Sequence, residues 1–151
     1  MMSQLIDDKQ LSLHLMIVLS RAYNSVTDVT NRNIHSYNLN PTEFGVLDLL
    51  YHKGDQPLQK IGEKVLISSG NITYVVDKLQ KKNLVQRRAC EEDRRVIYAE
   101  LTEQGRKFFE EIFPQHELAI QRAVSALNEE EKKTAIELLK KLGLGAANLK
   151  S

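Results

Sequence analysis

The apolar residues of this chain change their spacing near residue 84, and this change constrains the fold more than any other feature. Before it, apolar side chains recur at three- and four-residue steps, as they do in amphipathic helices. Residues 84–88 and 96–101 instead read as two short strands, separated only by a charged, turn-like segment. The pattern therefore predicts a mainly α (α+β) fold in which one antiparallel hairpin follows a series of helices.

Four helices are predicted before the hairpin, over about residues 9–34, 41–52, 57–65 and 69–82. Asn40, Pro41 and Glu43 are typical of the start of a helix. Ser68 is the expected cap of the fourth helix, and Asn83 suits the left-handed position after it. Because only a tight turn around Ser68 separates the third and fourth helices, they form a helix-turn-helix, and the hairpin that follows is a wing.

Two further helices are predicted after the hairpin. Thr102 is the expected cap of the first, which runs to about Leu127 and is broken or bent near Pro114. Asn128 starts the last helix, which is expected to stop at Gly143. The wing is therefore expected to lie between a long N-terminal helix and a helical C-terminal part.

The charge of the chain is unevenly distributed, although its formal net value is only +1. Residues 77–95 carry seven Lys and Arg against four Asp and Glu, whereas residues 100–137 carry five against nine. This separation indicates one face that attracts anions. The chain has neither an apolar run long enough to cross a bilayer nor the order of a signal peptide, so we expect a cytoplasmic protein.

The predicted helix 69–82 has the two faces that a DNA-reading helix needs. Ile72, Val75, Val76 and Leu79 form one apolar stripe. Small and hydrogen-bonding residues on the other face permit close approach to base edges in a major groove. The candidate contacts are Ser68, Ser69, Gly70, Asn71, Thr73, Tyr74, Lys78 and Lys81. A surface helix that binds nothing also has a polar face, so that alternative stays open.

The tip of the predicted hairpin carries the sequence Glu91-Glu92-Asp93-Arg94-Arg95. An arginine at such a tip can enter a narrow minor groove, where the potential is negative, and a neighbouring carboxylate can orient its guanidinium. Arg87 and Arg88 on the first strand are further candidate contacts to DNA. A solvated charged turn is the alternative for this segment.

The sequence resembles the MarR family of bacterial transcription regulators over nearly its whole length. Asp93-Arg94-Arg95, followed by Leu101-Thr102-Glu103-Gln104-Gly105, resembles the DxR…LTxxG wing signature of that family. Residues 40–44, 75–79 and 84–87 are similar to other stretches of the family. These motifs are specific in combination and weak singly.

The resemblance implies an obligate homodimer. In it, residues 1–37 and 103–151 form a helical dimerisation region, and residues 38–102 form the DNA-binding domain. Arg95 would be the minor-groove arginine, Asp93 its orienting partner and Arg94 a backbone contact. The implied partner is a pseudo-palindromic operator in double-stranded DNA. The implied function is repression, released by a small aromatic or phenolic ligand or by an electrophile.

The resemblance also implies an effector pocket where the first helix meets the winged domain. Candidates there are His14, Tyr23, His35, Tyr37, Phe44 and His52, with core packing or a surface contact as the alternative for each. Cys90, the only cysteine, follows Arg87 and Arg88 and is a candidate thiol sensor. The first helix lacks the reactive cysteine of redox-sensing relatives. The middle segment is similar to members that respond to quinones and aromatic compounds.

Other classes of function find little support. The sequence contains no HExxH motif, no Gly-rich phosphate loop and no GxSxG elbow, and its four histidines lack metal-ligand spacing. We therefore expect neither an enzyme nor a metal or cofactor site. A winged-helix module that binds protein and not DNA is the remaining alternative.

Overall fold

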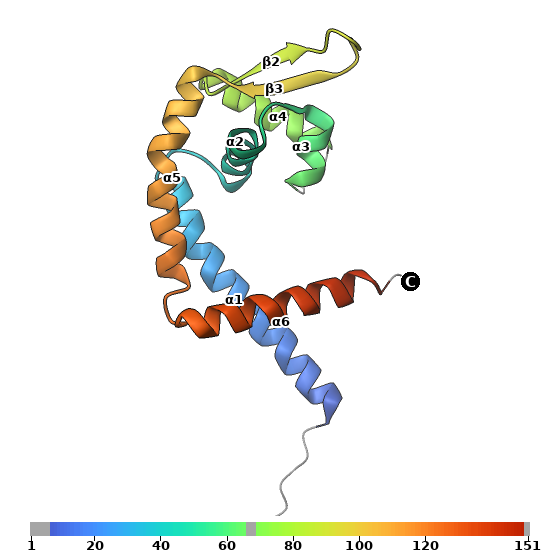
Figure 1. Ribbon diagram of the computed structural model, residues 1–151, viewed down its shortest axis with the longest axis vertical. Coiled ribbons are helices and arrows are strands. Elements are labelled where there is room, and N and C mark those ends of the chain that lie inside the picture. Colours follow the sequence, from blue (N-terminus) through green and yellow to red (C-terminus); the bar gives the residue numbers. More distant parts are fainter. Residues whose placement is uncertain (1–6, 66–68, 150–151) are drawn as a thin grey trace, which may run out of the picture.

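The computed structural model describes residues 7–65 and 69–149. Its elements are α1 (Asp8–His35), α2 (Pro41–Lys53), β1 (Gln56–Pro57), α3 (Leu58–Lys64), α4 (Ser69–Lys81), β2 (Val85–Ala89), β3 (Ile97–Leu101), α5 (Glu103–Ala123) and α6 (Glu129–Ala147). α2, α3, α4 and the sheet gather at one end of the molecule, α1 and α5 run side by side away from it, and α6 crosses α1 in the view (Figure 1). The predicted fold class, a winged helix-turn-helix with N- and C-terminal helices, is confirmed.

The predicted helix starts are formed by side-chain caps. Asn40 Oδ1 accepts from the backbone N–H of Glu43 at 2.7 Å, and Glu43 Oε1 accepts from the N–H of Asn40 at 3.1 Å. Asn128 and Glu131 make the same reciprocal pair at the start of α6. These bonds satisfy amides that have no partner within the helix, and short-range sequence signals were therefore enough to place both starts.

The sheet contains a strand that the sequence pattern did not predict. β2 and β3 form the expected antiparallel hairpin, in register from Val85 opposite Leu101 to Ala89 opposite Ile97. β1 pairs with the other edge of β3, giving the order β1-β3-β2. β1 is only two residues long, too short to show a period, and it ends at Pro57, so α3 begins one residue later than predicted.

Two predicted helix boundaries are wrong. α5 continues through Pro114 and ends at Ala123, short of Leu127, and α6 continues through Gly143 to Ala147. Buried residues on both sides of Pro114, including Ile112 and Ala119, hold α5 against the core in spite of the missing N–H. Gly143 lowers helix propensity without blocking the helix. The predicted turn and cap at Ser68 lie outside the described residues.

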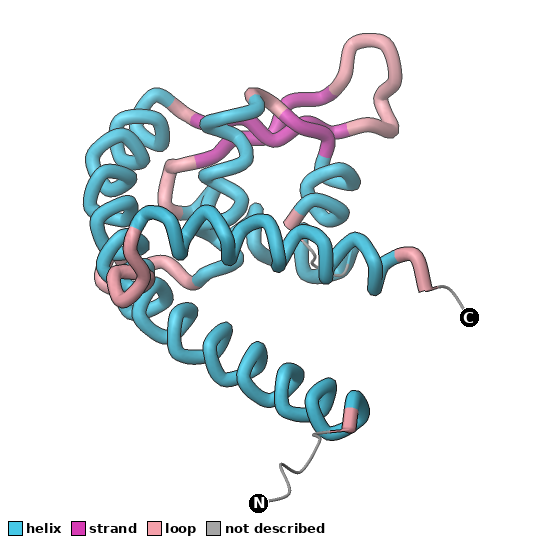
Figure 2. The backbone as a smooth tube through the Cα atoms, turned by 60° about the horizontal axis from the view of Figure 1, so that its bottom comes forward, coloured by secondary structure: helices cyan, strands magenta, loops and turns pink. Residues whose placement is uncertain are grey.

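The core is centred on the helices beneath the sheet. All four residues of the apolar stripe predicted on α4 are buried, and they pack with the fully buried Leu47, Ile61 and Phe109. The loop between β2 and β3 projects beyond these helices, away from the N-terminal end of α1 (Figure 2). The wing is therefore held by a rigid base while its tip extends into solvent.

Gly105 is packed so closely that we expect alanine there to destabilise the fold. A Cβ at this position would lie 2.0 Å from the carbonyl oxygen of Leu84, which also accepts from the N–H of Thr102. Because backbone must move to relieve the overlap, Gly105→Ala should lower the free energy of unfolding by about 1–3 kcal/mol. Thermal unfolding followed by circular dichroism measures this.

Gly145→Ala on α6 is the matched control, because a Cβ there has nothing within 4 Å among the described residues. It should leave stability unchanged or raise it by up to about 1 kcal/mol, since alanine favours helix. Equal melting temperatures for Gly105→Ala and the unsubstituted chain would contradict the close packing of α5 on the start of β2.

Candidate nucleic-acid interface

α4 presents an exposed polar face opposite its buried stripe. Asn71, Thr73 and Lys81 are exposed, and Tyr74 retains 61% of its surface. Lys78 Nζ lies 5.3 Å from the centre of the Tyr74 ring, so a cation and an aromatic ring are presented together. The predicted contacts on this helix thus share one accessible face. Ser69 and Gly70 belong to its first turn, but the exposure of these two residues, and all of Ser68, lie outside the described part of the structure.

At the tip of the wing, Asp93 orients Arg95. Arg95 Nε donates to Asp93 Oδ1 at 3.2 Å, and its Nη2 donates to Oδ2 at 3.4 Å. These bonds, with one from the Arg95 backbone N–H, lower the pKa of Asp93, so its carboxylate is protonated only at a more acidic pH than that of an ordinary aspartate. The Arg95 side chain is nevertheless 91% exposed, and Arg94 beside it is exposed as well. The Arg95 guanidinium is thus both paired with a carboxylate and accessible from outside the protein.

Arg87 is placed against α4, an arrangement that the sequence pattern did not predict. Its Nη2 lies 2.7 Å from Asp77 Oδ1, and its guanidinium also donates to Gln80 Oε1 and to the carbonyl of Thr73. The side chain of Arg87 is only 24% exposed. Its charge is therefore balanced within the protein, and Arg87 links β2 to α4.

Arg88 is likewise paired within the sheet. Its Nε donates to Glu100 Oε2 at 3.1 Å, its Nη2 lies 3.5 Å from Asp55, and its guanidinium covers the Tyr98 ring at 4.8 Å. The hydrogen bond to Glu100 raises the pKa of Arg88, while a bond from Gln86 is the main cause that lowers the pKa of Glu100. Both arginines predicted on β2 thus have intramolecular acidic partners, and their contact with DNA stays a prediction.

This arrangement has clear relatives. Residues 39–97, from the start of α2 to the wing, match the model of the MarR family. The HTH-type transcriptional regulator MhqR of Bacillus subtilis (strain 168) is 56% identical over 135 residues, which cover 89% of this chain and 93% of MhqR. The chain belongs to the MarR family. It is thus a transcriptional regulator and not an enzyme, as the sequence predicted.

Solved structures of MarR proteins share the fold. One is a structure of Bordetella bronchiseptica BpsR that concerns regulation of its DNA binding by 6-hydroxynicotinic acid. BpsR is 26% identical to this chain, and the two structures align with a TM-score of 0.76. The alignment covers 86% of this chain and 98% of the BpsR chain. Another is a mutant MarR from E. coli complexed with operator DNA, with a TM-score of 0.78 at 20% identity over 93% of this chain and 99% of its own. At that identity the second likeness establishes the fold alone.

The effector residues predicted for a MarR protein are only partly brought together. Phe44 is buried in the core, and Tyr37 is half-buried, its hydroxyl accepting from Asn33 Nδ2 at 2.8 Å. His52 is exposed on α2, 2.9 Å from Asp48. It borders a cavity of about 490 Å³ that is lined by Gly45, Asp48, Leu49, His52, Lys53, Lys64, Val65 and Phe113.

The other three effector candidates lie on α1. His14 and Tyr23 are exposed, Tyr23 retaining 68% of its surface. His35, at the end of α1, lines a smaller polar cavity of about 240 Å³ together with Asn38, Glu43 and Lys82. The candidates thus divide between the core, the His52 cavity and the exposed length of α1, and their roles stay predictions.

His116 is a buried polar residue that the sequence analysis did not single out. It is buried, its Nδ1 lies 2.9 Å from Asn33 Oδ1, and its ring lies 4.3 Å from that of Phe44. Burial lowers the pKa of His116, which favours the neutral ring. It joins α1, α2 and α5 where the long helices meet the winged domain. Its spacing from Phe109 and Ile112, on the buried stripe of α5, is the signal that could have found it.

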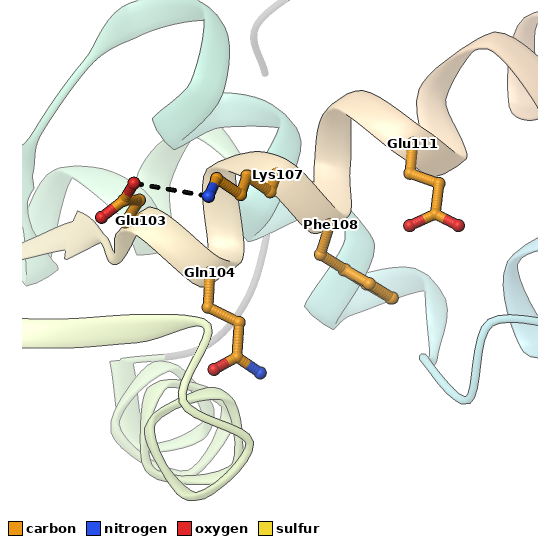
Figure 3. A pocket seen from close by; sticks show the side chains of 5 residues that line it. All are labelled: Glu103, Gln104, Lys107, Phe108 and Glu111. Atoms are coloured by element: carbon orange, nitrogen blue, oxygen red, sulfur yellow. Dashed lines mark ion pairs between the residues drawn. The ribbon is translucent and has the colours of Figure 1, made fainter.

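Two further features bear on the predicted sites. Cys90 is half-buried at the end of β2, and its backbone N–H donates to the carbonyl of Val96 at 3.0 Å. A hollow of about 530 Å³ lies along α5 (Figure 3), lined by Glu103, Gln104, Lys107, Phe108 and Glu111. One helix supplies all five side chains and four of them are polar, so the hollow lacks the apolar enclosure typical of small-molecule sites.

The described residues form neither a membrane-spanning helix nor a metal-binding cluster. In the part of the chain that the structure describes, none of the helices combines the length and apolar character needed to span a bilayer. The same residues contain no group of three or more His, Cys, Asp or Glu arranged to hold a metal ion.

Proposed function

We propose that the chain is a sequence-specific DNA-binding regulator that acts as a homodimer. In this proposal α4 enters the major groove and Arg95 enters the adjacent minor groove of each half-site, while Arg94 contacts the backbone. The observation that carries the proposal is the Asp93–Arg95 pair at the exposed tip of the wing, which follows directly on the open polar face of α4. Membership of the MarR family supports it.

The apolar surface of the long helices supports the dimer. Exposed large apolar residues on α1 are Leu11, Leu13, Leu15, Met16, Ile17 and Val18, and those on α6 are Ile136, Leu138, Leu139, Leu142 and Leu144. A monomeric protein rarely exposes so many large apolar side chains on two of its helices, and exposed apolar patches mark interfaces. We therefore assign dimerisation to residues 1–37 and 103–151, and DNA binding to residues 38–102. Two-fold symmetry then calls for a pseudo-palindromic operator with half-sites about one helical turn apart.

We further propose that the dimer represses by covering promoter DNA and is released by a small aromatic or phenolic compound. The cavity beside His52 lies on α2, close to the Phe113 ring of α5, and has both polar and apolar walls. BpsR, whose DNA binding is regulated by a hydroxylated aromatic acid, supports this class of effector. An effector that favours the unbound conformation by about 1–3 kcal/mol weakens DNA binding about 5- to 150-fold. An electrophile reacting at Cys90 is the second route to release.

Selection of bound duplexes from a random pool tests the proposal. The selected DNA should contain a pseudo-palindrome, and its affinity should fall steeply with salt, because each phosphate contact contributes about 0.9 to the log–log slope. A flat salt response and an unselected pool would instead favour a protein-binding module. Titrating phenols and quinones against the complex, with Cys90→Ser as the control, separates a bound effector from a modified thiol.

A further inference from the structure

A buried ion pair joins the C-terminal end of α4 to the start of α2. Lys82 Nζ lies 2.9 Å from Glu43 Oε2, and the Glu43 side chain is only 3% exposed. The same ammonium donates to the backbone carbonyl of Asn38 at 2.7 Å. Lys82 therefore binds both α2 and the connection between α1 and α2, although it follows α4 in the chain.

The polar atoms of this ion pair have hydrogen-bond partners. Glu43 Oε1 accepts from the N–H of Asn40 and Oε2 accepts from Lys82, so both carboxylate oxygens have partners. The Lys82 side chain is 30% exposed, which leaves its third N–H access to water. A buried carboxylate is strongly disfavoured without a cation. The Glu43 charge therefore holds Lys82, and with it the end of α4, in one place.

The adjacent residues make this end of α4 a junction. Asn83 has a φ of 61°, and its carbonyl accepts from the Thr102 hydroxyl at the start of α5. β2, the first strand of the wing, begins at Val85. The position of Lys82 thus affects three parts of the molecule together: α4, the wing and the connection between α1 and α2.

Small movements of α4 matter for reading DNA. A helix of 13 residues is about 20 Å long, so a slight tilt at one end displaces side chains at the other. Base contacts need placement to within about 0.5 Å. A fixed contact at the C-terminal end of α4 can therefore determine which bases the exposed face of this helix contacts.

We propose that Lys82 and Glu43 are positioning residues, which form a clasp that sets the orientation of α4 on the operator. The inference rests on the proposed DNA binding and deepens it by assigning these two residues to specificity without contact with DNA. It separates Lys82 from its neighbour Lys81, which is exposed on α4 and is predicted to contact DNA directly.

The test compares Lys82→Met, Glu43→Gln and the double variant with Lys81→Met as the matched control. Glutamine can keep the capping bond to Asn40 through its Oε1. Its amide nitrogen then faces Lys82, so Glu43→Gln removes both the charge and the oxygen that accepts from Lys82. The double variant leaves neither charge buried and keeps the comparison valid where a single variant folds poorly. Fluorescence anisotropy gives the affinity for the selected operator and for a random duplex of equal length over a salt series. Circular dichroism fixes a temperature at which each variant is folded.

The clasp predicts that both single variants lower the ratio of operator to random-duplex affinity by about two- to thirtyfold, with the salt slope unchanged. The double variant should lower this affinity ratio no further than the more affected single variant does, because the two residues act as one unit. Lys81→Met should weaken both duplexes and reduce the salt slope, by about 0.9 for each lost contact.

Three results would overturn the inference. Tighter binding of Glu43→Gln to both duplexes, or a smaller salt slope in Lys82→Met, would make Lys82 a phosphate contact. An unchanged affinity ratio in all clasp variants would remove the positioning role while leaving DNA binding intact. Failure of the unsubstituted chain to bind selected DNA would instead refute the proposed function, and the clasp with it.

Discussion

Arg95→Ala is expected to weaken operator binding by about thirtyfold or more while leaving the fold unchanged. Loss of one base-reading arginine costs about 1–3 kcal/mol, and a dimer loses two. The side chain of Arg95 is 91% exposed and its acidic partner lies two residues away, so its removal leaves no cavity. Anisotropy with the selected duplex measures the loss, and circular dichroism checks the fold.

Neighbouring variants make the Arg95 result specific. Asp93→Asn keeps the arginine but weakens its orientation, and should therefore cost less than Arg95→Ala. Arg94→Ala should reduce the salt slope and weaken all duplexes alike, as loss of a phosphate contact does. Full affinity in Arg95→Ala would exclude this side chain from the interface and leave the wing as a solvated turn.

Leu139→Glu is expected to separate the dimer and to abolish tight operator binding. Leu139 is 52% exposed within the apolar face of α6, and a charge there would be buried without a partner in a dimer. Two linked half-site contacts bind about 10²- to 10⁴-fold more tightly than one, so a monomer loses that factor. Sedimentation velocity at micromolar concentration and anisotropy measure the two effects.

Lys141→Glu on the same helix is the matched control. It changes charge at least as much, but it lies on the side of α6 opposite Leu139 at helical spacing. This variant should remain dimeric and should bind the operator. A dimeric Leu139→Glu with full affinity would contradict the assignment of α6 to the dimer interface.

Local signals in the sequence were sufficient for most of the fold. The reciprocal caps at Asn40 and Asn128, the left-handed Asn83 and the buried stripe of α4 depend on residues within one or two turns. The sequence predicted a break or a bend near Pro114, and the break is wrong because α5 continues through this residue. Packing of α5 against distant helices keeps it helical, and no short stretch of sequence contains that packing.

In the candidate interface too, contacts between residues close in sequence were predictable and contacts between distant residues were not. Asp93 and Arg95 are only two residues apart, so their pairing is predictable from the sequence. Lys81 and Lys82 are indistinguishable in sequence, yet one is exposed and the other binds a carboxylate 39 positions away. Arg87 and Arg88 are predicted contacts to DNA because they are basic and lie on the first strand of the wing. Their partners Asp77 and Glu100 are brought close only by folding, so the sequence did not reveal these ion pairs.

The stoichiometry of the DNA complex tests the central claim most directly, and native mass spectrometry measures it. With a duplex carrying the selected pseudo-palindrome, we expect two chains of 17.3 kDa on one duplex, with no stable intermediate of one chain. A duplex that carries only one half-site should bind far more weakly. A single chain bound tightly to either duplex would contradict a dimer that reads two half-sites with paired α4 helices and arginine-tipped wings.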